Sequence, residues 1–329
     1  MNWRFLVTLR IDEVPTLSNQ VITEVERAIV GKTLLLKKIM AAVLAGGHIL
    51  LEDYPGLGKT LIAKSFATAL GLEFKRIQFT PDLLPGDITG GYIYDRTRNR
   101  FELRKGPIFA NIILADEINR ASPKTQSALL EAMQERQVTL EGKTMELPKP
   151  FTVMATQNPI EYEGTFPLPE AQLDRFIMKL SVGYPLPEEE QEILKRRKKR
   201  QQDEIELNGV TDREEVLSMQ RAIEGVYLDP DLERYMVDLA SKTRQDARVS
   251  VGSSPRGPLA LLKLSMAYAA MKGRDYVIPD DVKGFASPAL IHRLILVPEL
   301  WMKSGAAGDV IEDVLGSVSV PVIDGVDGE

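Results

Sequence analysis

Five short apolar runs divide the first half of the chain, and patterns typical of helices separate them. Several runs are apolar at nearly every position, which is expected of strands buried on both faces of a parallel sheet. Between the first two runs, one apolar stripe predicts a helix over residues 60–70, with Gly71 in the place of a C-terminal cap. The order strand, helix, strand predicts βαβ units. The five predicted strands are residues 48–52, 75–80, 112–117, 151–158 and 176–182.

The pattern changes after the proline-rich segment 184–187. Acidic residues followed by the basic run 195–200 predict a helix whose charges match the helix dipole. We interpret the basic run as a solvated helix face, while a nucleic-acid contact stays open. From residue 211 to residue 300 the pattern is helical, with breaks at three Pro-containing steps. The sequence thus predicts an α/β domain over 1–184, a linker helix over 185–204 and an all-α lid domain with a C-terminal tail over 205–329.

Composition narrows the chemistry that the chain can perform. A length of 329 residues corresponds to about two domains. The 41 Lys and Arg residues against 47 Asp and Glu give a net charge of −6, which argues against a protein that lies on nucleic acid. The absence of Cys excludes disulfides, thiolate nucleophiles and zinc fingers, and the two His residues, at positions 48 and 292, do not have the spacing of an HExxH site. Carboxylates, amines, amides, hydroxyls and a hard metal such as Mg²⁺ remain.

No segment of the sequence has the length and apolar character of a membrane span. The uncharged stretch 39–51 is shorter than the roughly 20 apolar residues that a spanning helix needs. The apolar run 5–9 near the start is too short for the core of a signal peptide. We therefore expect a cytoplasmic protein.

Residues 50–60 form a candidate phosphate-binding loop, because they follow an apolar strand and open a helix. Backbone N–H groups of such a turn converge on an anion, and Lys59 adds a full positive charge. Thr60 is expected to place its hydroxyl on Mg²⁺. Asp53 stands where the motif G-x-x-x-x-G-K-[ST] has its first Gly, and we expect Asp to replace it because Asp tolerates turn and left-handed conformations. The expected nucleotide contacts are Pro55, Gly56, Leu57, Gly58, Lys59, Thr60 and Leu61.

A second motif, the acidic pair Asp116-Glu117, ends the apolar run 112–117. Asp116 can hold Mg²⁺, and Glu117 can polarise a water for attack on a γ-phosphate. The sequence contains no Asn-Lys dipeptide and so lacks the guanine-reading Asn-Lys-x-Asp motif, which favours ATP over GTP. These motifs together predict an ATP-binding and ATP-hydrolysing site.

Four blocks of the chain resemble the MoxR-type AAA+ ATPases. The first block runs from Leu114 through Glu135, and the others are Ala155-Thr156-Gln157-Asn158-Pro159, residues 168–176 and Ser254-Pro255-Arg256. The resemblance covers residues 18–321. It implies an α/β P-loop NTPase fold of the AAA+ type, with a five-stranded parallel sheet flanked by helices, β-hairpin insertions and a smaller all-α lid. It also implies ATP/ADP and Mg as cofactors.

The resemblance also assigns roles to individual residues. Asn158 is similar to the sensor-1 residue that binds the attacking water or the γ-phosphate, and Arg175 to the arginine finger that reaches a neighbouring subunit. Arg120 is a rival for the finger. Arg256 is similar to sensor 2, and whether it serves its own or a neighbouring nucleotide stays open. Val30 and Gly31 resemble the segment that packs on adenine. Each residue also has a plain alternative. Asn158 can be a capping or turn residue, Arg175 can form a surface ion pair, and Arg256 can simply start a helix. Residues 30–31 can form a simple turn.

Two polar turns flanked by alternating residues predict β-hairpins over 91–106 and 138–147. In the family these insertions face the ring pore or the substrate. The basic residues of the first hairpin are either a solvated face or a contact for an acidic partner or a phosphate backbone.

The family implies a homo-oligomeric ring, expected to be a hexamer, that uses ATP hydrolysis to remodel a protein client, with a von Willebrand factor A domain protein as partner. One alternative is a nucleic-acid motor of the minichromosome-maintenance type, which shares both hairpins. Another is a nucleotide switch that does not hydrolyse ATP.

Overall fold

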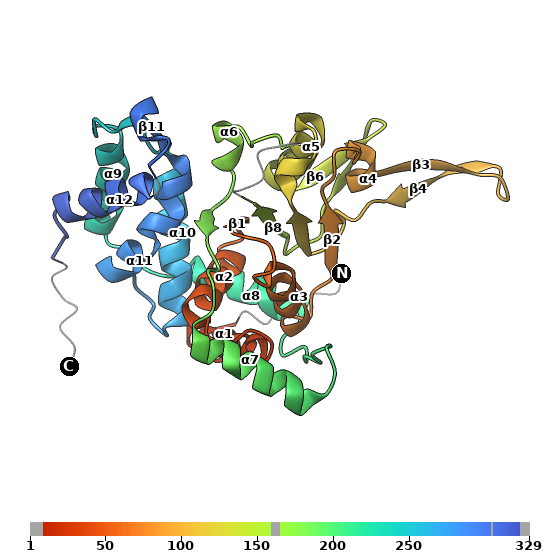
Figure 1. The fold of residues 1–329 in the computed structure, drawn as a ribbon, viewed down its shortest axis with the longest axis horizontal. Helices are drawn as coiled ribbons and strands as arrows, with labels where there is room; N and C mark the ends of the chain where they lie inside the picture. Colours follow the sequence, from red (N-terminus) through yellow and green to blue (C-terminus); the bar gives the residue numbers. More distant parts are fainter. Residues whose placement is uncertain (1–8, 159–164, 304, 323–329) are drawn as a thin grey trace, which may run out of the picture.

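Five parallel strands in the order β2-β5-β8-β1-β9 form the central sheet of the computed structural model, which describes residues 9–158, 165–303 and 305–322 (Figure 1). All five strands predicted from the sequence are present, and each is shorter than expected. The edge strand β9 has three residues instead of seven, and in this sheet it pairs only with β1. The strands are β1 (Ile49–Glu52), β2 (Phe74–Gln78), β5 (Ile112–Asp116), β8 (Thr152–Gln157) and β9 (Met178–Leu180).

The alternation of side chains along the strands produces two hydrophobic layers. In β5, Ile112 and Leu114 join one cluster, whereas Ile113 and Ala115 join the other. The first cluster continues through α1, α2 and α3 into the lid helices, and the second packs mainly against α5. Because all five residues of β5 are buried, the apolar run predicted as a doubly covered strand is confirmed. The helices of these layers are α1 (Val14–Glu26), α2 (Thr33–Leu44), α3 (Lys59–Ala69), α4 (Pro85–Thr89), α5 (Pro123–Glu135) and α6 (Glu170–Leu173).

Both predicted hairpins are present. The first, β3 (Gly90–Asp95) with β4 (Arg100–Lys105), projects from the body of the molecule in Figure 1. The rings of Tyr94 and Phe101 contact each other in this hairpin, and both side chains are exposed. The second hairpin pairs β6 (Gln137–Leu140) with β7 (Lys143–Glu146) around a turn of two residues with positive φ.

The predicted linker helix corresponds to α7 (Pro187–Arg200), which has no buried residue. The lid helices follow, and three of them start beside the Pro residues that break the helical pattern. The lid also contains a two-stranded antiparallel pair, β10 (Val249–Val251) with β11 (Ile295–Leu296), which the sequence patterns did not predict. Among the described residues, no helix combines the length and hydrophobicity needed to cross a bilayer. The lid helices are α8 (Arg213–Ile223), α9 (Pro230–Thr243), α10 (Arg256–Met271), α11 (Pro279–Leu290) and α12 (Ala306–Ser317).

Candidate functional site

The predicted phosphate loop connects β1 to the start of α3, at the carboxyl edge of the sheet. Gly58 precedes the helix with a φ of 80°, and Gly56 has a φ of 85°. No heavy atom lies within 4 Å of the place where a Cβ would stand at either glycine. The loop therefore combines a conformation that favours Gly with open space in front of its backbone, which is the arrangement that lets N–H groups approach a phosphate.

Lys59, the first residue of α3, lies at the base of this loop. Its Nζ atom donates a hydrogen bond to the carbonyl oxygen of Asp53 at 2.5 Å. Burial lowers the pKa of Lys59, whereas the carboxylates of Asp53, Asp116 and Glu117 act in the opposite direction. The ammonium group is thus held inside the loop and next to the acidic end of β5.

Asp53 replaces the first Gly of the motif for a reason that we did not expect. Its φ is not positive, so the left-handed conformation invoked from the sequence is not used. Its buried carboxylate instead accepts hydrogen bonds from Gly183 N at 2.6 Å, Ser181 Oγ at 2.8 Å and Tyr54 N at 2.9 Å. Burial alone would raise the pKa of Asp53, but these bonds outweigh it and the pKa is lowered. Asp53 therefore ties the phosphate loop to the segment after β9.

The acidic pair lies where β5 ends, and neighbouring strands hold both carboxylates. Asp116 Oδ2 accepts from Arg76 of β2 at 2.7 Å, and Asp116 Oδ1 accepts from Thr156 Oγ1 of β8 at 2.6 Å. Glu117 has a φ of 56°, a conformation that a non-glycine residue adopts at a cost of roughly 1 kcal/mol or more. Its Oε2 accepts from Gln78 Nε2 at 2.7 Å. The sharp turn separates the two carboxylates while keeping both at the strand end.

One polar cavity of about 410 Å³ brings most of the predicted site together. Asn158, which follows β8, is buried and lines this cavity. Since cations, carboxylates, hydroxyls and an amide face one space, the cavity can hold a phosphate chain and a water beside it. Its lining consists of Pro55, Gly56, Gly58, Lys59, Thr60, Leu61, Arg76, Asp116, Glu117, Thr156 and Asn158.

A second cavity of about 360 Å³ adjoins the first, because Gly56, Gly58 and Leu61 line both. Val30 and Leu57 also line it, together with the apolar side chains of Ile29, Val182, Ile193 and Ile205. This lining suits a flat heterocyclic base. Leu61, which we expected to contact nucleotide, is 38% exposed and lines both cavities.

Gly31 does not line the described part of this apolar cavity. It has a φ of 73°, and a Cβ there would lie 2.0 Å from the carboxyl group of Glu189 at the start of α7. The segment predicted to pack on adenine therefore splits into two roles. Val30 faces the cavity, and Gly31 lets α7 approach.

The predicted arginine finger and the predicted sensor 2 do not line the phosphate cavity. Arg175 and Arg256 line a third cavity of about 240 Å³ that shares no residue with the two cavities beside the phosphate loop. Arg136 and Lys263 add further positive charge to it. The chain thus brings Arg175 and Arg256 together but keeps both away from its own phosphate loop.

Arg120, the rival for the finger, is placed differently. Its Nη1 donates to Glu117 Oε2 at 3.1 Å within the same chain. It therefore lies beside the acidic pair and not with Arg175.

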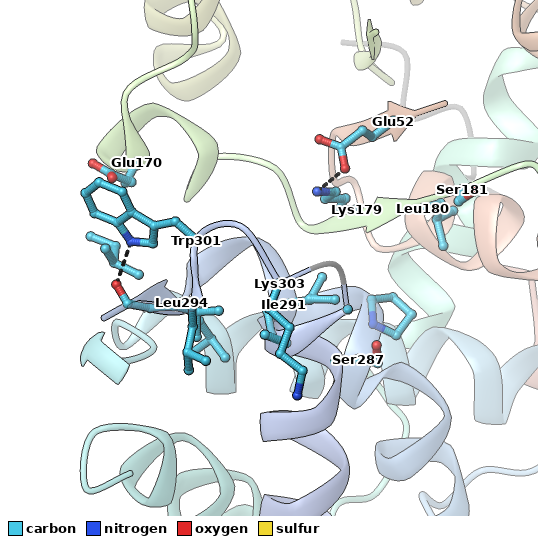
Figure 2. A pocket seen from close by; sticks show the side chains of 18 of the residues that line it. Glu52, Glu170, Lys179, Leu180, Ser181, Ser287, Ile291, Leu294, Trp301 and Lys303 are labelled. Atoms are coloured by element: carbon cyan, nitrogen blue, oxygen red, sulfur yellow. Dashed lines mark hydrogen bonds and ion pairs between the residues drawn. The ribbon is translucent and has the colours of Figure 1, made fainter. Parts of the chain in front are cut away.

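A larger cavity of about 830 Å³ lies between the edge of the sheet and the lid. Figure 2 shows Lys179 of β9 in contact with Glu52 of β1 on one side, and Trp301 and Ile291 on the other. The indole Nε1 of Trp301 donates to Leu296 O at 2.9 Å. None of the residues predicted from the sequence to bind nucleotide or metal lines this cavity.

Sequence reasoning missed several residues of the site. Thr156 carried a signal, because it precedes Asn158 by two positions and a strand brings such residues to the same face. Arg76 carried none, since its contact with Asp116 depends on the order of the strands. The contribution of Ile193 from α7 required the position of the linker helix.

Comparisons with known proteins agree with this geometry. Residues 48–178 match the AAA family described as "ATPase family associated with various cellular activities", and residues 241–314 match an AAA lid domain. The chain is 49% identical over 311 residues to the uncharacterized protein YeaC of Bacillus subtilis (strain 168), covering 94% of this chain and 97% of that protein.

Two further matches cover nearly the whole chain. Chaperone MoxR1 of Mycobacterium tuberculosis is 43% identical over 323 residues, with 95% of this chain and 85% of that protein covered. A crystal structure from Cytophaga hutchinsonii, of a protein provisionally named an ATPase, superposes with a TM-score of 0.88 at 40% identity, covering 94% and 96% of the two chains. The resemblance inferred from the sequence is confirmed, and the chain belongs to the MoxR family of AAA+ ATPases.

Proposed function

We propose that this chain hydrolyses ATP with Mg²⁺ as a homo-oligomeric ring, expected to be a hexamer, and uses the energy to remodel or activate a protein client. One observation carries the proposal. Lys59, Glu117 and Asn158 line one cavity, whereas Arg175 and Arg256 line another on the same chain. Because a heterologous ring places different surfaces of neighbouring subunits together, these arginines are available to the next subunit's site.

In this proposal the phosphate loop and Lys59 bind the β- and γ-phosphates, and the apolar cavity takes the adenine. Glu117 accepts the proton of the attacking water while Asn158 orients that water. Gln78 holds the Glu117 carboxylate at 2.7 Å. A neighbouring Arg175 neutralises charge on the transferred phosphoryl group, and Arg256 acts beside it, on the neighbour's nucleotide.

Thr60 and Asp116 would hold the Mg²⁺ ion. Both offer oxygen atoms in one cavity, and Mg²⁺ takes one or two protein ligands together with phosphates and waters. The described residues contain no cluster of three acidic or His side chains that could bind a metal without a nucleotide, which fits that pattern. When bound, the ion neutralises the phosphate oxygens.

The client role is supported by the name of the relative MoxR1, a chaperone. A von Willebrand factor A domain protein as partner and a cytoplasmic location are proposed from the family resemblance. We also propose the division into residues 1–184, 185–204 and 205–329. Arg98 and Arg100 of the first hairpin pair with Glu102, which does not favour a nucleic-acid motor.

The proposal is tested with Glu117→Gln. This variant is expected to bind ATP as the wild type does but to release phosphate at least about 100-fold more slowly, because a general base contributes that much. Glu135→Gln, at the end of α5, is the control and should keep full turnover. Wild-type turnover in Glu117→Gln would contradict the assignment. Absence of phosphate release from the wild-type ring would indicate a nucleotide switch, and turnover stimulated by DNA would indicate the motor.

A further inference from the structure

A buried arginine of the lid holds the backbone on both sides of Arg175. Arg293 belongs to the short helix Ile291–Arg293 after α11, and its side chain is 2% exposed. Its Nη2 donates to Phe176 O at 2.8 Å and to Asp174 O at 3.4 Å. Its Nη1 donates to Ile177 O at 3.4 Å. Because these carbonyl groups flank Arg175, the guanidinium fork fixes the chain from which the Arg175 side chain projects.

The carboxylate of Asp174 connects this arginine to the start of α10. Asp174 Oδ1 accepts from Arg293 Nε at 2.9 Å, and Oδ2 accepts from Ser254 Oγ at 2.8 Å. Arg256 Nε lies 3.9 Å from the same Oδ2. Ser254 Oγ in turn accepts from Arg256 N at 3.1 Å. The Asp174 carboxylate therefore contacts Arg293, which holds the backbone around Arg175. It also contacts Ser254, which accepts a bond from the backbone of Arg256.

The Arg175 side chain itself is left available. It is half-buried, and its guanidinium makes no hydrogen bond or ion pair with another residue in the described part of the chain. Burial lowers the pKa of Arg293 to about 10, and Asp174 acts in the opposite direction, so Arg293 stays charged at neutral pH. The charged Arg293 side chain thus holds the backbone around Arg175, while the Arg175 guanidinium faces the cavity.

We propose that Asp174, held by Arg293, is the positioning residue for the arginine pair Arg175 and Arg256. It sets the spacing of the two guanidinium groups before they meet the neighbouring nucleotide. This inference rests on the proposed shared site. It gives the lid residue Arg293 a role in the hydrolysis of ATP that the neighbouring subunit binds.

The test compares Asp174→Asn with the wild type in kcat and KM for ATP. We expect kcat to fall about 10- to 100-fold, because misplacing a catalytic group by about 1 Å has that effect, with KM changed little. Arg293→Lys keeps the charge without the fork and should lie between the two. The control is Asp281→Asn, which breaks the ion pair of Arg274 with Asp281 inside the lid at 2.7 Å and should leave kcat unchanged.

Rings assembled from two different variants distinguish a positioning defect from a folding defect. An Asp174→Asn subunit keeps its own phosphate loop, so a Lys59→Ala neighbour with an intact finger should restore its turnover. Wild-type kcat in Asp174→Asn, or a loss that Lys59→Ala subunits do not restore, would overturn the inference. If Arg175→Ala itself keeps wild-type kcat, the shared site fails. If Arg175→Ala is inactive while Asp174→Asn is active, only the inference fails.

Discussion

Replacing Asp53 by Gly restores the usual phosphate-loop motif, and we predict that it lowers the stability of the folded protein. The substitution removes a carboxylate that accepts three hydrogen bonds, from Gly183 N, Ser181 Oγ and Tyr54 N. Tyr54 is 39% exposed, so its N–H can bond to water instead. Ser181 is also exposed, so its hydroxyl can bond to water as well, whereas the half-buried Gly183 N–H loses its partner at a cost of about 1–3 kcal/mol. A further 0.5–1 kcal/mol, roughly, comes from the greater freedom of Gly in the unfolded chain.

The expected loss is therefore about 2 kcal/mol in the free energy of unfolding. For a chain of 329 residues that lowers the melting temperature by about 3 °C. Urea unfolding and a thermal melt measure both quantities. Asp53→Asn is the matched control, because its carbonyl oxygen keeps the bonds from Ser181 and Gly183, and it should lose about 1 kcal/mol. An Asp53→Gly protein as stable as the wild type would refute this reasoning and leave Asp53 as a simple turn residue.

Two further predictions follow from the structure. Burial lowers the pKa of His48 to about 4, with Nε2 donating to Met133 O and Nδ1 accepting from Val153 N, so the ring is neutral in the folded state. Its stabilising effect is complete above the unfolded pKa of about 6.5 and is lost as pH falls toward 4, which amounts to about 2 kcal/mol between pH 7 and pH 5. Urea titrations of the wild type and His48→Gln should differ in pH dependence by that amount, and identical pH dependence would contradict the prediction. Gly31→Ala should lower the melting temperature and weaken ATP binding, because a Cβ meets Glu189. Glu189→Ala removes the clash but also the bond from Leu186 N to Glu189 Oε2, so it serves as the reference background. In that background Gly31→Ala should cost only about 1 kcal/mol from the positive φ, and an unchanged loss would argue against the contact.

The sequence predicted the strands, the phosphate loop and the acidic pair because local patterns determine them. Buried strands such as β5 are apolar throughout, and Lys59 follows directly from its motif. It did not predict contacts that depend on the arrangement of strands and domains. Arg76 reaches Asp116 because β2 lies next to β5, and Asp53 contacts Gly183 because β9 lies next to β1.

The distal arginines illustrate the same limit. The sequence left open whether Arg256 serves its own nucleotide, since that depends on where the lid lies. In the structure Arg256 lines the cavity of Arg175 and is absent from the lining of the phosphate cavity. The basic run of α7 was interpreted as solvated, yet Arg196 donates to Glu26 O at 2.7 Å and lines the apolar cavity.

The shared site is tested most directly by mixing two inactive variants. Arg175→Ala keeps its phosphate loop but lacks the proposed finger, and Lys59→Ala keeps that finger but lacks the lysine that we propose binds phosphate. In a ring assembled from equal amounts, about one quarter of the sites combine an intact loop with a neighbouring intact finger. Phosphate release should therefore recover to about one quarter of the wild-type rate per subunit. Mixed rings that form but stay as inactive as either variant alone would contradict the account.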